Sequence, residues 1–172
     1  LVSEQIKDGD SIMLDASSTA VYVAKTLLEQ GKKNLTVLTN SVEIIIELFG
    51  AQDWKVLSTG GESREGSFAL VGYQTDRMLR SYHVDKAIIS AKGIDMNAGL
   101  TDSDDLHANN KRTMLTRAKD KILAVDSSKF DQVAFAEIGS LDQITTIVTD
   151  AKPETRWLQY FDKIGVKCIY PK

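Results

Sequence analysis

The chain has 172 residues, of which 42% are hydrophobic and 26% are charged, proportions typical of one globular domain. Its 21 Lys and Arg against 24 Asp and Glu give a formal net charge of −3, which argues against direct binding to duplex DNA through the phosphates. No apolar run is long enough to cross a membrane, and the single cysteine, Cys168, excludes an internal disulfide and is typical of a reducing compartment, so we expect a cytoplasmic protein without a membrane partner.

Short apolar runs alternate with stretches of helical periodicity along the chain. The pattern predicts strands at 11–14, 35–39, 54–58, 86–90, 121–125, 144–148 and 166–169. It predicts helices at 19–30, 42–49, 72–82 and 105–119, and a further helix through Trp157 and Phe161. This alternation indicates right-handed βαβ crossovers, and therefore an α/β fold with a mainly parallel sheet and helices on both faces.

Polar residues follow five of the predicted strands. They are 15–19, Asn40 with Ser41, Thr59 to Gly61 with Arg64 nearby, Lys92 to Asp95, and Asp126 to Lys129. In open α/β sheets, ligands bind beyond the carboxyl ends of the strands. Any one short polar loop is unremarkable, but five at one edge of a sheet indicate a ligand site.

The run Ser17, Ser18 and Thr19 stands where a helix is predicted to begin. One hydroxyl suffices to cap a helix, whereas three hydroxyls beside free N–H groups also suit a phosphate. Asp15 either bonds the N–H groups of its own loop or accepts a hydrogen bond from a sugar hydroxyl. Lys129 is expected in solvent unless a ligand anion lies near it.

The other motifs are less specific for a binding site. The pair Gly60-Gly61 is either a tight turn or a place where a ligand approaches the backbone. Lys111 and Arg112 are interpreted as part of a solvated helix face. No dinucleotide fingerprint or phosphate-loop lysine is present, so we expect no cofactor. His83 and His107 lie far apart in the sequence and Cys168 has no obvious partner, so we expect no metal site, and His107 is interpreted as a surface histidine.

Taken in order, these loops resemble the C-terminal effector-binding domain of DeoR-family bacterial transcription regulators. The residues that carry the resemblance cover nearly the whole chain: Asp8 to Asp10, Leu14 to Thr19, Leu38 to Ser41, Thr59 to Gly61 with Arg64, Gly72, Asp85 to Ala87, Gly93 to Asp95, Gly99 to Thr101, Lys111-Arg112, Asp126 to Phe130 and Ile147 to Asp150.

The resemblance implies the fold shared by ribose-5-phosphate isomerase, glucosamine-6-phosphate deaminase and CoA transferases, with a small added lobe. It implies that residues 1–172 form one effector-binding and oligomerisation domain that binds a phosphorylated sugar or a related metabolite. Operator DNA would be read only by an N-terminal winged helix-turn-helix outside this sequence, which fits the missing initiator Met. The residues onto which the family's pocket maps are Asp15, Ser17, Ser18, Thr19, Asn40, Gly60, Gly61, Arg64, Gly93, Asp95 and Lys129.

Three functions are open at this point. The first is a ligand-sensing domain of a transcription regulator, forming a homodimer or homotetramer. The second is a sugar-phosphate isomerase or deaminase on the same fold, which would need a positioned carboxylate base. The third is an oligomerisation module without a ligand. We favour the first, because the resemblance is to regulators and the sequence offers no carboxylate pair of the kind that isomerase motifs require.

Overall fold

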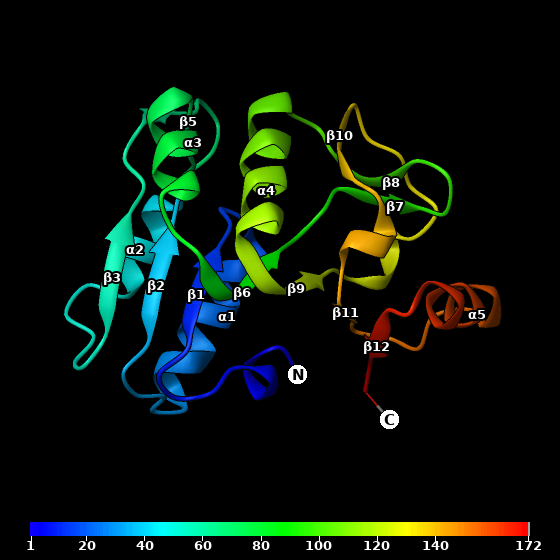
Figure 1. The fold of residues 1–172 in the computed structure, drawn as a ribbon, viewed down its shortest axis with the longest axis horizontal. Coiled ribbons are helices and arrows are strands. Elements are labelled where there is room, and N and C mark those ends of the chain that lie inside the picture. The colour runs from blue at the N-terminus through cyan, green and yellow to red at the C-terminus, as the bar shows by residue number, and fades with distance from the viewer. Residues whose placement is uncertain (172) are drawn as a thin grey trace.

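The computed structural model describes residues 1–171. Its centre is a seven-stranded sheet in which every neighbouring pair of strands is parallel (Figure 1). The strands lie in the order β12 (Lys167–Ile169), β11 (Thr146–Val148), β9 (Ala118–Ala124), β6 (Val84–Ile89), β1 (Ser11–Leu14), β2 (Thr36–Thr39) and β3 (Lys55–Ser58). This arrangement confirms the predicted fold class and places all of their carboxyl ends at one edge.

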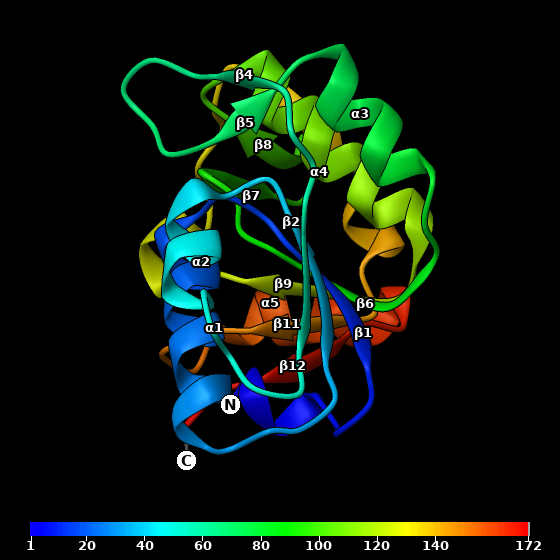
Figure 2. The same cartoon turned by 90° about the vertical axis from the view of Figure 1, so that its left-hand side faces the viewer.

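Helices cover both faces of the sheet (Figure 2). One face carries α1 (Ser18–Glu29) and α2 (Val42–Glu47), and the other carries α3 (Tyr73–Arg80), α4 (Asp105–Arg117) and α5 (Thr155–Ile164). Because successive side chains of a strand point to opposite faces, each strand serves two cores. On β1, Ile12 packs on the α1 side, and Met13 packs on the α4 side.

Two smaller sheets stand at the same end as the carboxyl edge. The strands β7 (Gly93–Asp95), β8 (Gly99–Asp102) and β10 (Ala136–Gly139) form an antiparallel sheet in the order β10-β8-β7, which is the expected small lobe. The strands β4 (Glu62–Ser63) and β5 (Leu70–Val71) form a hairpin whose loop projects from the body (Figure 2). None of these five strands was predicted. The strands β4, β5 and β7 have only two or three residues, and β8 (GLTD) and β10 (AEIG) lack the continuous apolar run by which the four-residue β1 was predicted.

The α5 segment belongs to the core. Trp157 and Phe161 are each 1% exposed, and the ring of Phe130 meets Trp157 edge-on with centroids 5.1 Å apart. Three short 3-10 turns complete the chain: Ser3–Gln5, Ser127–Lys129 and Leu141–Gln143. Within residues 1–171, no helix has the length and apolar character needed to cross a membrane.

Candidate ligand-binding site

A polar cleft of about 660 Å³ lies at the carboxyl edge of the sheet, within the size range of small-molecule sites. Its walls come from the β1–α1 loop, the β4–β5 loop, the β6–β7 connection, the start of α4 and the loop after β9. Five residues predicted from the sequence line it: Ser17, Ser18, Thr19, Arg64 and Lys129.

The start of α1 presents unused N–H donors to this cleft. Ser17 is the N-cap, and its Oγ accepts from the amide of Ala20 at 3.1 Å. The first main-chain hydrogen bond of the helix runs from Val21 N to Ser17 O. The amides of Ser18 and Thr19 come before this bond and therefore have no carbonyl partner within the helix. These amides, their side-chain hydroxyls and the positive end of the helix dipole suit an anion.

Asp15 anchors the β1–α1 loop through its side-chain hydrogen bonds. Its side chain is buried, and Oδ1 accepts from the amide of Ser17 at 3.1 Å and also from its hydroxyl. Its Oδ2 accepts from the amide of Ser90 at 2.9 Å, just after β6. Asp15 therefore fixes the helix start against the β6–β7 connection, and it does not line the cleft itself.

The cleft has a buried ion cluster in its floor. Lys111 of α4 is 6% exposed, and its Nζ lies 2.5 Å from Asp102 Oδ2 and 3.4 Å from Asp15 Oδ2. Burial alone lowers the pKa of the ammonium, but the charges of Asp15 and Asp102 outweigh burial and raise the pKa, so Lys111 stays charged. The interpretation of Lys111 as part of a solvated face was wrong, because this side of α4 packs over the strand ends.

The same cluster corrects a second expectation. The structure brings together two buried carboxylates, Asp15 and Asp102, that the sequence did not reveal as a pair. Both carboxylates are bound to the Lys111 ammonium rather than free.

The β4–β5 loop forms the outer wall. Arg64 donates to Asp104 Oδ2 from Nε at 3.0 Å and from Nη2 at 2.5 Å, and Ser67 Oγ lies 3.5 Å from Nε2 of the half-buried His107. Asp104 also caps α4 by accepting from the His107 amide. Partial burial raises the pKa of Asp104, but the His107 amide and the Arg64 guanidinium outweigh burial and lower it.

Two lysines complete the lining. Lys129 Nζ lies 3.8 Å from Asp126 Oδ2, a long ion pair, and the Ser128 hydroxyl lowers the pKa of Asp126. Lys92 is exposed and has no carboxylate partner among the described residues. It follows β6, the strand that pairs with β1.

The other predicted site residues lie outside the cleft lining: Asn40, Gly60, Gly61, Gly93 and Asp95. The side-chain amide of Asn40 donates to Leu70 O and joins the end of β2 to the β4–β5 hairpin. Gly60 O accepts from the hydroxyl of Thr75, and a side chain at Gly61 would collide with that hydroxyl.

The last two of these residues are parts of the small lobe. A side chain at Gly93 would collide with the main chain of Gln132, so the position needs a glycine for close packing. Asp95 Oδ1 accepts from the amides of Asn97 and Ala98 and closes the β7–β8 turn, and these bonds lower the pKa of Asp95.

Sequence reasoning missed four chemically important lining residues: Lys92, Asp102, His107 and Lys111. Lys92 is among the polar residues that follow the predicted strands, but it was not counted among the ligand-binding residues. The other three belong to β8 or α4, and no local pattern places these elements over the carboxyl edge of the sheet.

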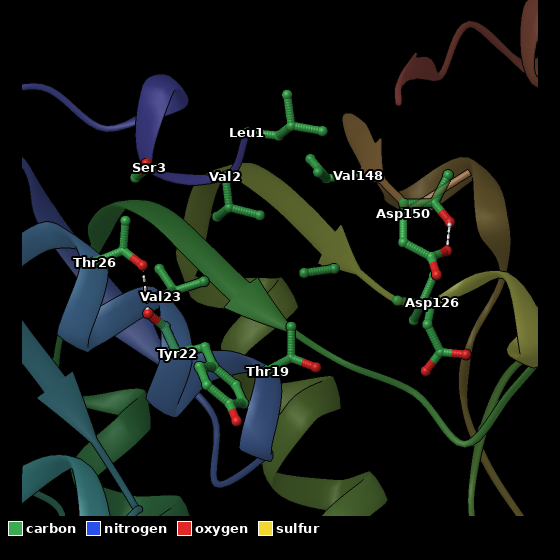
Figure 3. A pocket seen from close by; sticks show the side chains of 13 residues that line it. Leu1, Val2, Ser3, Thr19, Tyr22, Val23, Thr26, Asp126, Val148 and Asp150 are labelled. Atoms are coloured by element: carbon green, nitrogen blue, oxygen red, sulfur yellow. Dashed lines mark hydrogen bonds between the residues drawn. The ribbon is translucent and has the colours of Figure 1, made fainter. Parts of the chain in front are cut away.

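A second pocket, of about 350 Å³, shares lining residues with the cleft, and Figure 3 shows its walls. Its walls are mostly apolar and come from the first residues of the chain, α1, β9 and β11, with Val2, Val23 and Val148 among them. Thr19 and Asp126 border both spaces. The apolar walls do not suit a phosphate, which favours the cleft as the anion site.

Solved structures similar to this chain share its fold. The eIF2B delta subunit from Chaetomium thermophilum matches 85% of this chain and 51% of its own, with a TM-score of 0.60 and 19% identity. Ribose 5-phosphate isomerase from Plasmodium falciparum matches 75% of this chain and 48% of its own, with a TM-score of 0.51 and 18% identity. At this identity the likeness concerns the fold alone.

Curated relatives are transcription regulators. The HTH-type transcriptional regulator YulB of Bacillus subtilis (strain 168) is 40% identical over 149 residues, which are 87% of this chain and 57% of the relative. The L-fucose operon activator of Escherichia coli (strain K12) is 36% identical over 147 residues, 86% of this chain and 59% of the relative. The glycerol-3-phosphate regulon repressor of the same organism is 29% identical over 158 residues, 92% of this chain and 62% of the relative.

This chain thus spans about three fifths of the length of these relatives. The family model described as the DeoR C terminal sensor domain matches residues 1–151. The chain therefore belongs to the DeoR C-terminal sensor domain family of transcription regulators.

Proposed function

We propose that this sensor domain binds a monophosphorylated sugar in the polar cleft, with the phosphate at the start of α1. The carrying observation is the group of unused amides and hydroxyls of Ser18 and Thr19 that lines a cleft of ligand size. Lys129 and Lys92 supply the cations that offset the phosphate charge. Two relatives are named for glycerol-3-phosphate and L-fucose regulation, which supports a phosphorylated polyol or sugar.

Ligand binding regulates a DNA-binding domain elsewhere in the full-length protein. A ligand shifts such an equilibrium only by its differential affinity for the two states. The acidic domain itself does not hold the operator, since its formal net charge is −3.

The domain is not an enzyme in this proposal. Isomerisation through an enediol needs a carboxylate that is free to take a carbon-bound proton. The aspartates of the cleft are already engaged: Asp102 with Lys111, Asp104 with Arg64, and Asp126 with Ser128. The remaining carboxylate of the lining, Glu65, is exposed to solvent on the β4–β5 loop, where no hydrogen bond or ion pair of the described residues holds it in position. This arrangement favours binding over turnover.

The domain also self-associates in this proposal. Ile46 on α2 is 65% exposed, Phe49 in the turn after α2 is 90% exposed, and Phe68 in the neighbouring hairpin loop is 68% exposed. The loop lies against the helix, because Phe68 O accepts from the amide of Val42. Three large exposed apolar side chains on one short helix, its following turn and the loop bonded to it favour an interaction surface.

Phosphorus NMR with a panel of sugar phosphates tests the function. We expect resonances of one or two compounds to broaden or shift without new peaks, and Ser18→Ala to lower their affinity at least about tenfold by removing a hydroxyl bonded to a charged group. Thr26→Ala, on α1 in the wall of the second pocket but outside the cleft lining, is the control and should bind like the wild type.

Two results would count against the proposal. New phosphorus resonances that grow with time would show that the domain converts the compound, and would identify it as an enzyme. If no compound of the panel changed its resonance, the result would contradict a phosphate site at the start of α1.

A further inference from the structure

The ion cluster in the cleft floor has unused hydrogen-bonding capacity. Lys111 carries three N–H donors, and Asp102 and Asp15 take two of them. The oxygens of Asp15 are occupied by Ser17, Ser90 and Lys111. The remaining capacity is one N–H of Lys111 and the Oδ1 side of Asp102, which has only a 3.5 Å contact with Ser103 Oγ.

This donor and this acceptor stand side by side, because Lys111 Nζ lies 2.5 Å from Asp102 Oδ2. Both residues line the cleft although they are 6% and 3% exposed. A hydroxyl group both donates and accepts, so neighbouring hydroxyls of a polyol match such a pair. A ligand group that enters the floor must make the hydrogen bonds to these two charged groups that water would otherwise make. A hydroxyl can do so because it both donates and accepts.

The charge of the cluster decides against a second anion. Two carboxylates and one ammonium leave a formal charge of −1 in a site with little solvent screening. Arg64 also lines the cleft but is itself paired with Asp104. A phosphate or carboxylate at the floor would therefore face net repulsion.

We propose that Asp102 and Lys111 form a hydroxyl-reading subsite that selects monophosphorylated polyols and rejects bisphosphates and phosphosugar acids. This inference rests on the proposed function, because it takes the phosphate at α1 as the other end of the ligand. Asp15 joins the two ends, since it bonds both Ser17 of the α1 start and Lys111 of the floor.

The test compares three probes by calorimetry: inorganic phosphate, the hexose monophosphate of the panel that binds most tightly, and fructose 1,6-bisphosphate. Asp102→Asn keeps the size of the side chain and leaves Lys111 paired with Asp15. We expect it to weaken the monophosphate about tenfold or more and to leave inorganic phosphate unchanged. We expect the wild type to bind the monophosphate at least about tenfold more tightly than the bisphosphate, and D102N to narrow that ratio.

Asp105→Asn is the matched control, because Asp105 lies on the first turn of α4, is exposed and does not line the cleft. It should bind all three probes like the wild type. If D102N does not fold, the wild type with the matching deoxy analogues decides: no deoxy analogue weaker than its parent would overturn the subsite.

Two patterns overturn the inference and leave the proposed function standing. One is an equal loss of inorganic phosphate and monophosphate in D102N, which would mean that Asp102 only supports the α1 loop. The other is unchanged binding of every probe. If instead no probe binds the wild type, the proposed function fails first and the subsite with it.

Discussion

Lys111 is the residue on which the cleft depends most. A lysine that is 6% exposed is tolerated only because two carboxylates face it. Removing the lysine would leave two like charges together in the same buried place. Removing either carboxylate leaves the lysine with one partner.

We therefore expect Lys111→Met to destabilise the domain by about 3–5 kcal/mol, because it leaves buried charge without a partner. Urea unfolding at pH 7, followed by circular dichroism, measures this change. Arg112→Met is the control on the same helix. Arg112 is exposed and bonds only to Glu137 O, so its loss should cost less than about 1 kcal/mol. Equal midpoints for the two variants would mean that the cluster contributes nothing to stability.

The sequence could not have revealed this role. The residues around Lys111 have the pattern of a polar helix surface, and its partners come from the β1–α1 loop and from β8. The hydroxyl site at 17–19 could be predicted from the sequence, because the strand end, the helix cap and the first helical residues follow one another directly. Local chemistry could thus be predicted, whereas a cluster assembled from a loop, a strand and a helix could not.

At the scale of elements, the β4–β5 hairpin connects the cleft to the outer surface. Residues 64–67 of its loop line the cleft, and the next residue, Phe68, belongs to the exposed apolar group beside α2. A second copy of the chain that bound at Phe68 would therefore contact the residue next to Ser67, which lines the cleft. The hairpin escaped prediction because its strands have two residues each and are defined by pairing rather than by pattern.

The exposed apolar side chains on α2 and in the turn after it give a prediction at this scale. We expect the domain to sediment as a dimer or larger assembly and Phe49→Ser to shift it toward the monomer at equal concentration, since Phe49 is 90% exposed and contributes little to folding. Phe135→Ser is the matched control, an equally large side chain that is 86% exposed in the small lobe. Sedimentation velocity makes the comparison, and a monomeric wild type or an unaltered F49S assembly would refute this surface.

For the molecule as a whole, the periodicity of apolar residues predicted the seven strands and five helices of the main body to within a few residues. Strand order could not be predicted, because parallel strands joined by helices leave several orders open. The arrangement of β7, β8 and β10 over the sheet edge could not be predicted either. That lobe supplies Asp102, which explains why the predicted site stopped at the strand ends.

The expectation that the chain folds as one unit leads to a last prediction. Trp54 packs against the core beside α1 and α2, and Trp157 lies in the core beside α4 and α5. Trp54→Phe and Trp157→Phe each leave one tryptophan, so the fluorescence of each variant reports one core. We expect that in each variant fluorescence and circular dichroism give the same urea midpoint, as in a two-state transition. W157F should have the lower midpoint of the two, because Trp157 is 1% exposed and Trp54 is only partly buried.

The reason for this coupling lies in the strands. Adjacent residues Ile12 and Met13 of β1 serve opposite cores, and so do Val37 and Leu38 of β2. Neither core can lose its strands without exposing the apolar side chains of the other, so both should unfold together. Separate fluorescence and circular dichroism midpoints in either variant would instead divide the chain into two folding units. The cleft would then lie between units that move, because α1 and α4 cover opposite faces of the sheet and both contribute to its walls.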